Sequence, residues 1–243
     1  MNDFATAFAH AFAMIGAFDP DLVSIVALSL QVSLSAVAIA ALIGLPLGAA
    51  VALFRFPGVG VLAVLLNAMM SLPPVVVGLI VYLLISRAGP LGVLGLLFTP
   101  TAMIFAQVLL VMPIIAALTR QVVVDLWDEY SELLRSLGIG RGRAMATLLW
   151  DGRTRVLSVV LAGLGRAMAE VGAVMIVGGN INHVTRVMTT TIALETSKGN
   201  LTLALGLGIV LLGISLLING AIYAIGNASS RRELFECTLT SAV

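Results

Sequence analysis

Two opposite charges stand four residues apart inside a long apolar stretch of this sequence. Arg166 and Glu170 are separated by three apolar residues, so on an α-helix they would share one face and could form an ion pair. Exposing either charge to lipid would cost roughly 2.5 to 3.5 kcal/mol, so both side chains should face protein or water. We expect either a structural ion pair or a part of a transport pathway or its inner gate.

A pair of prolines interrupts another apolar stretch. Ser71 precedes Pro73 and Pro74, and Gly78 follows them. A proline inside a helix removes a backbone hydrogen bond, and a membrane tolerates the freed carbonyl only where protein or a water-lined cavity satisfies it. The segment is therefore predicted to be a bent helix near a pore, and a simple packing kink remains the alternative.

Hydroxyl groups and a cation gather in a third segment. Thr185, Arg186, Thr189, Thr190 and Thr191 could together offer hydroxyls, a guanidinium and free backbone amides to a small dianion. A capped loop that turns into a short helix explains the same residues and is the interpretation we favour. Thr189 and Thr190 remain candidates for the pathway.

The polar stretch 120–155 contains a candidate docking site. Leu133, Leu134 and Leu137 recur at helical spacing with polar residues between them, which predicts a short amphipathic helix ended by Gly138. A second helical stretch should follow and lead into the next apolar run. The apolar face of so short a helix needs a cover, which is either lipid or a cytosolic partner protein.

Catalysis by the chain itself is not expected. His10 and His183 lie outside the apolar stretches, and Glu170 is the only acid deep within one. The single cysteine, Cys237, excludes a multi-cysteine metal site. The single lysine, Lys198, is followed by glycine rather than by serine or threonine, so the sequence has no Walker A loop for ATP. We therefore predict neither catalytic nor metal-binding residues.

The composition indicates that lipid is part of the solvent. Hydrophobic residues make up 60% of the chain and charged residues only 10%, against roughly 25% charged residues in a soluble domain. Crossing a bilayer takes about 20 apolar residues. Five apolar runs meet or approach that length: 22–54, 59–86, 101–118, 156–177 and 201–225. We predict an all-α membrane protein of about five transmembrane helices.

The flanks of this membrane domain are short. A transmembrane domain is assigned to 22–226, with the loop 120–155 in the cytoplasm. The segment 1–21 is expected outside or at the interface, where 4–18 would form an interfacial helix or an ordinary buried segment. The segment 227–243 would be a short cytoplasmic tail.

The basic residues are distributed unevenly between the two ends of the predicted helices. With the N-terminus outside, nine lie on the inner side: Arg55, Arg120, Arg135, Arg141, Arg143, Arg153, Arg155, Arg231 and Arg232. Only Arg87, Arg186 and Lys198 lie on the outer side. Because cytoplasmic loops carry the excess of Lys and Arg, we predict an outer N-terminus and an inner C-terminus. The net charge of +1 argues against a nucleic-acid partner.

The polar loop resembles the EAA motif of ABC importer permeases, which is Glu-Ala-Ala, three further residues and then Gly. Glu132 and Gly138 occupy matching positions, Leu133 and Leu134 replace the two alanines, and Trp150-Asp151 stands where many members have Leu-Pro. In that family the first helix of the loop inserts into a cleft of the ATPase and transmits its closure. The resemblance assigns coupling to Glu132, Leu133, Leu134, Arg135, Leu137, Gly138 and Arg141.

Further segments resemble molybdate and tungstate permeases in the same order along the chain. They are Ser71 to Gly78, Gly89-Pro-Leu-Gly92, Ala106-Gln107, Met112-Pro113, Arg166 to Ala173, Gly178 to Ile181, and Thr185 to Glu195. The last of these is most similar to the tungstate branch. The resemblance covers most of 22–225. The residue arguments above give the pathway or gate candidates: Ser71, Pro73, Pro74, Arg166, Glu170, Thr189 and Thr190.

This resemblance implies a type I ABC importer permease fold and the import of a small oxyanion, tungstate or molybdate, driven by ATP. The chain would form a homodimer, bind two copies of a separate ATPase subunit that holds ATP and magnesium, and receive substrate from an extracytoplasmic oxyanion-binding protein. It would hold no cofactor itself and lie in the cytoplasmic membrane of a bacterium or archaeon. A secondary transporter or channel for small anions is the alternative.

Overall fold

The computed structural model describes residues 11–13, 15–54 and 57–240, with side chains up to Ala224. Its described regular elements are all helical: α2 (Pro20–Leu53), α3 (Val59–Met70), α4 (Pro74–Ile85), the 3-10 turn η1 (Gly92–Leu94), α5 (Pro100–Ser136), α6 (Arg141–Asp151), α7 (Arg153–Met168), α8 (Gly172–Gly178), α9 (Met188–Lys198) and α10 (Leu201–Thr240). The prediction of an all-α protein is confirmed. Most of the stretch 4–18, with its predicted interfacial helix, lies outside the described residues.

Three helices, α2, α5 and α10, are each long and apolar enough to cross a membrane alone. Two bent pairs of helices are long and apolar enough only when each pair is taken together: α3 and α4 meet at an angle of 102°, and α7 and α8 at 58°. Counting each pair as one span gives the five that the sequence predicts. The proline segment is thus a sharp break rather than a gentle bend, and the run 156–177, predicted to be continuous, is interrupted as well.

Two helices are longer than the sequence suggests. The predicted third span, 101–118, and the predicted short amphipathic helix belong to the single helix α5, which has 37 residues. No glycine or proline stands between 118 and 136, so nothing in the sequence ends the helix there. The tail 227–243, predicted as a separate polar segment, continues α10 as far as Thr240.

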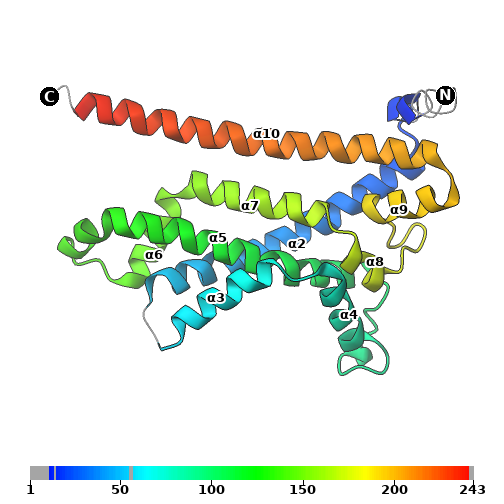
Figure 1. Ribbon diagram of the computed structural model, residues 1–243, viewed down its shortest axis with the longest axis horizontal. Helices are drawn as coiled ribbons and strands as arrows, with labels where there is room; N and C mark the ends of the chain where they lie inside the picture. The colour runs from blue at the N-terminus through cyan, green and yellow to red at the C-terminus, as the bar shows by residue number, and fades with distance from the viewer. Residues whose placement is uncertain (1–10, 14, 55–56, 241–243) are drawn as a thin grey trace.

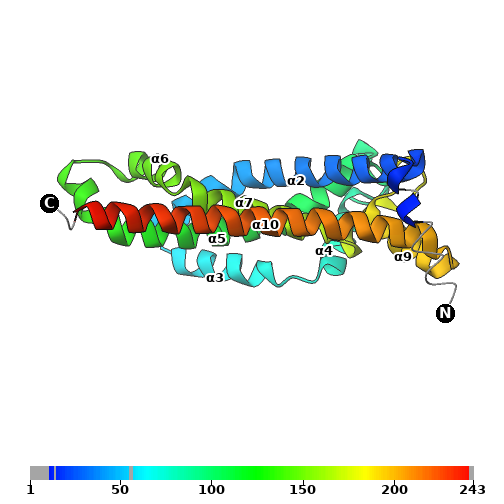
Figure 2. The same cartoon turned by 90° about the horizontal axis from the view of Figure 1, so that it is seen from above.

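Helices α2 and α5 pack side by side at the centre of the bundle (Figure 1). Small residues allow this close approach: a Cβ atom added to Gly48 of α2 would lie within 3 Å of both Ala116 and Thr119 of α5. Helix α7 covers the pair, and α10 lies outermost against α7 and α9. Figures 1 and 2 both place the C-terminal end of α10 at the end of the bundle that carries α6.

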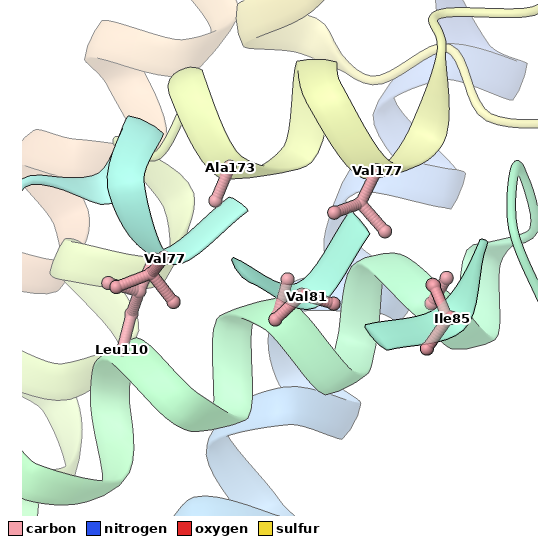
Figure 3. Close-up of a cluster of buried hydrophobic side chains, with 8 residues drawn as sticks. Val77, Val81, Ile85, Leu110, Ala173 and Val177 are labelled. Atoms are coloured by element: carbon pink, nitrogen blue, oxygen red, sulfur yellow. The ribbon is translucent and has the colours of Figure 1, made fainter. Parts of the chain in front are cut away.

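The two broken spans pack against each other through the halves that follow their breaks. Helices α4 and α8 share a buried cluster with α5 that includes Val77, Val81, Leu110 and Val177 (Figure 3). Their backbones approach closely because Gly78 faces Ala173, and a Cβ atom on Gly78 would lie 2.6 Å from the Ala173 Cα atom. The cluster therefore joins the proline break to the break between α7 and α8.

The contact at Gly78 gives a prediction for stability. Gly78→Ala should destabilise the folded protein by about 1 to 3 kcal/mol, because the added methyl group meets backbone that cannot move away freely. Gly60→Ala in α3 is the matched control, since nothing lies within 4 Å of its added Cβ atom. Thermal unfolding of the purified protein checks the difference, and equal melting temperatures for the two variants would contradict it.

Candidate functional site

The segment predicted to bind a partner spans the C-terminal end of α5. Gly138 has a φ of 67°, in the left-handed region that glycine adopts at little cost. The amide of Gly138 donates to the Arg135 carbonyl at 3.0 Å, and the amide of Ile139 donates to the Leu134 carbonyl at 2.9 Å. These two bonds form a Schellman cap, so Gly138 ends the helix as predicted.

The three leucines of this segment do not share one surface. Leu134 is 5% exposed and lies in a buried cluster with Leu126 of α5 and Leu148 of α6. Leu133 and Leu137 are 58% and 65% exposed. The cluster also includes residues from the end of α2, so it fixes the segment to the bundle. The prediction of a common apolar docking face is therefore corrected: Leu134 anchors the segment, and Leu133 and Leu137 project from it.

The charged side chains of the segment lie on its surface. Glu132, Arg135 and Arg141 are exposed, and the guanidinium of Arg135 lies 5.7 Å from the centre of the Trp127 ring. Trp150, at the far end of α6, is also exposed. We call the exposed residues Leu133, Arg135 and Leu137 at the end of α5 the tip. The tip presents apolar and basic side chains together, and the buried cluster around Leu134 holds it in place. This composition is suited to protein contact.

The second candidate site is the break between α7 and α8. Helix α7 ends at Met168, so Arg166 and Glu170 do not share one continuous helix as predicted. They nevertheless form an ion pair, with Arg166 Nη1 2.7 Å from Glu170 Oε2. The other carboxylate oxygen accepts the Ala173 amide at 3.1 Å. Glu170 therefore both neutralises Arg166 and satisfies a free amide in the first turn of α8.

Neighbouring side chains satisfy the backbone that this break leaves unpaired. Gln107 Nε2 donates to the Ala167 carbonyl at 3.1 Å, and Thr189 Oγ1 donates to the Glu170 carbonyl at 2.8 Å. Gln107 is a lone side-chain amide in the apolar run 101–118, a signal in the sequence for a buried polar contact. Its Oε1 atom is buried without a partner in the described chain. It lines a cavity of about 10 Å³ with Ser33 and Glu170, enough space for one water molecule.

The proline break lies beside this site. Pro73 and Ser71 are exposed and Pro74 is half-buried. A Cβ atom on Gly172, at the start of α8, would lie 2.7 Å from Val75 Cγ2, at the start of α4. The structure thus brings the two predicted pathway regions together. One face of α4 beyond the prolines is apolar and exposed: Val75, Val76, Leu79, Ile80 and Leu83.

The hydroxyl groups of Thr185 and Thr190 form hydrogen bonds within the fold. Thr185 Oγ1 donates to the Gly178 carbonyl and accepts the Ile181 amide. Thr190 is fully buried and donates to Asn180 Oδ1 at 3.0 Å. These bonds hold a loop that leads into α9, so the structure shows the capped loop and short helix that we favoured. Thr190 contributes to this cap and not to an open surface.

The buried carboxylate of Glu195 lies near the C-terminal end of α9. Glu195 is 5% exposed and accepts hydrogen bonds from Lys198 Nζ at 2.9 Å and from Asn200 Nδ2 at 3.1 Å. The bond from Lys198 holds the pKa of Glu195 below its ordinary value, and the bond from Asn200 and the charge of Arg186 act in the same direction. The ionised form of Glu195 is therefore part of the folded state.

This lowered pKa gives a pH-dependent prediction. Because the pKa of Glu195 is lower in the folded state, its stabilising effect is present near neutral pH and is lost as the pH falls through the folded-state pKa. Glu195→Gln should cost about 1 kcal/mol at neutral pH, a modest value because Lys198 is half exposed. The difference in melting temperature from the unmodified protein should shrink in acid. A difference that does not change with pH would contradict this account.

Known proteins resemble this chain over most of its length. No protein-family model matches it. It is 41% identical to the tungstate uptake system permease protein TupB of Peptoclostridium acidaminophilum, over 93% of this chain and 99% of that protein. It is also 41% identical to a probable anion ABC transporter permease protein of Haloferax volcanii, over 82% of this chain and 88% of that protein. The TupB protein of Campylobacter jejuni is 37% identical over 68% of this chain. The chain therefore belongs to the family of ABC anion transporter permeases that includes the tungstate uptake permeases.

Proposed function

We propose that this chain is the membrane-spanning subunit of an importer that moves tungstate into the cell at the expense of ATP. Relatives named as tungstate uptake permeases support tungstate as the substrate. The exposed tip at Leu133 and Leu137, held on the end of α5, is the structural observation that carries the proposal. Its partner is a separate ATPase subunit, which binds ATP and magnesium.

The length of α5 suggests how a movement driven by ATP hydrolysis is transmitted to the pathway. Helix α5 runs unbroken from Pro100 to Ser136, which corresponds to about 55 Å at 1.5 Å per residue. Its cytoplasmic end carries the tip, and about 45 Å away Gln107 holds the end of α7 through the Ala167 carbonyl. When the ATPase moves the tip, α5 transmits the displacement to the break between α7 and α8.

The remaining partners follow from the same proposal. The exposed apolar face of α4 and the neighbouring break at Glu170 form half of a pathway, and a second copy of the chain supplies the other half. An extracytoplasmic binding protein delivers the oxyanion at the end of the bundle opposite α6. The N-terminus lies outside and the C-terminus inside, and the common location of the α10 end and α6 supports this orientation.

Reconstitution tests the proposed function. The permease, its ATPase and its binding protein are placed in liposomes, and uptake of tungstate is measured with ATP and with a non-hydrolysable analogue. We expect uptake only with ATP, and stronger competition by unlabelled tungstate than by sulfate. Uptake that proceeds without ATP hydrolysis, or uptake with which unlabelled tungstate does not compete, would contradict the proposal.

A further inference from the structure

A pocket lies at the end of the bundle opposite α6, the end at which the binding protein is proposed to deliver the oxyanion. It has a volume of about 180 Å³ and lies between the start of α2, the start of α10 and the loop before α9. Its polar lining is Asp21, Ser24, Asn182, His183 and Arg186, and its apolar lining is Ile25, Leu28 and Leu203. Figures 1 and 2 both place the starts of α2 and α10 at the end of the bundle where α9 lies.

The cation of this pocket is available for a ligand. Arg186 Nε is buried and has no hydrogen-bond partner in the described chain. The nearby carboxylate of Glu195 is already bound by Lys198 and Asn200, so it does not hold Arg186 by a hydrogen bond. Because Nε is itself buried, a ligand in the pocket would contact the terminal nitrogens of the Arg186 guanidinium, whose donors match the geometry of phosphate oxygens. Arg186 therefore points to a ligand with a tetrahedral oxyanion group.

The other residues that line the pocket indicate which kind of oxyanion-bearing ligand fits it. Asp21 lines the same pocket and makes no ion pair with a described residue, so it would repel a free dianion but attract an amine. Leu28 follows Asp21 by seven residues on α2, and therefore lies about 10 Å deeper in the membrane-spanning helix. The pocket thus has charged residues at its opening and apolar residues deeper along the helix. A phospholipid at a membrane interface has the same order, with a charged headgroup above apolar acyl chains.

We propose that this pocket binds the headgroup of a phosphatidylethanolamine-type phospholipid. The phosphate would accept hydrogen bonds from Arg186, and Ser24 and Asn182 are further polar groups within the pocket. The ammonium group would pair with Asp21, and the acyl chains would run over Ile25, Leu28 and Leu203. The inference is independent of the transported ion, because it requires only that the chain lies in a bilayer.

Lipid binding to the purified transporter complex tests this site. The complex is stripped of lipid and then offered phosphatidylethanolamine, phosphatidylglycerol or phosphatidylcholine with identical acyl chains, and bound lipid is counted by native mass spectrometry. We expect phosphatidylethanolamine to bind most tightly. Arg186→Gln should weaken its binding about tenfold through loss of a charge-assisted hydrogen bond. Asp21→Asn should remove the preference over phosphatidylglycerol.

Two controls make the outcome decisive. Arg87→Gln removes an exposed arginine that lines a different cavity, and should leave lipid binding unchanged. In a separate arm, sodium phosphate and sodium tungstate are added to the lipid-free complex. If either anion binds at Arg186 while the lipid headgroup makes no difference, the pocket is an oxyanion site and the proposal is wrong. Equal binding of all three lipids to every variant would also overturn it, whatever the result of the uptake assay.

Discussion

Replacing Gly138 with tryptophan is expected to abolish ATP-driven uptake, whereas Gly138→Ala should retain most of it. Both substitutions place a side chain at a φ of 67°, which costs each variant about 1 to 2 kcal/mol. Nothing in the described chain lies within 4 Å of a Cβ atom at this position. The added Cβ atom itself therefore meets no obstacle in the described chain, and a large loss of uptake in a Gly138→Trp protein that still folds and inserts would indicate a partner in the space around Gly138.

The expected size of this difference is a loss of uptake of about tenfold or more for Gly138→Trp, because exclusion of one well-packed contact at an interface costs more than about 1.4 kcal/mol. Copurification with the ATPase should fall in parallel, while the amount of permease in the membrane stays within about twofold of the Gly138→Ala variant. Equal uptake by the two variants would show that no partner docks there.

Glu170→Leu is expected to leave Arg166 without its counter-ion and to lower the amount of folded transporter. Glu170 is 4% exposed and also accepts the Ala173 amide. Removal of one partner from a buried ion pair costs 3 to 5 kcal/mol. The Arg166 side chain is one-third exposed and can be hydrated in part, so we expect about 2 to 3 kcal/mol.

A set of variants separates the two roles of Glu170. Glu170→Gln keeps one acceptor, for the Ala173 amide, but loses the charge and the second oxygen that accepts from Arg166. It should therefore be less destabilised than Glu170→Leu but impaired in transport. The double change Arg166→Leu with Glu170→Leu should recover part of the lost stability, because no unpaired charge remains. Thermal unfolding gives the stability of each variant, and uptake gives its function. If Glu170→Leu were fully stable and active, the pair would be dispensable for both.

Patterns in the sequence located a helix end and a contact between charges, but not how each side chain packs. Gly138 was predicted to end a helix, and its positive φ confirms the reason. The spacing of Leu133, Leu134 and Leu137 indicated one amphipathic face, but it could not show that α6 folds back and buries Leu134. That contact joins residues of different helices, so periodicity along one helix contains no information about it.

The same limit applies to the ion pair. The spacing of Arg166 and Glu170 predicted their contact, and the contact exists at 2.7 Å. The predicted cause was a shared helix face, whereas the observed cause is a break after Met168. Neither glycine nor proline stands between Ala167 and Val171 to signal the break. Gln107 and Thr189 provide tertiary hydrogen bonds that compensate for it, and the Ala173 amide adds a local bond to the Glu170 carboxylate.

The most direct test of the account is the side of the membrane on which the tip of α5 lies. Cysteine is introduced at Leu137, or at Val93 near the opposite end, in a chain whose own Cys237 is changed to serine. Leu137 is 65% exposed and Val93 is 98% exposed, so a membrane-impermeant maleimide can reach either one from the side that it faces. We expect intact cells to be labelled at position 93 and to be labelled at position 137 only after permeabilisation. Labelling at position 137 in intact cells would place the tip outside, beyond the reach of a cytosolic ATPase, and would contradict both the orientation and the coupling mechanism.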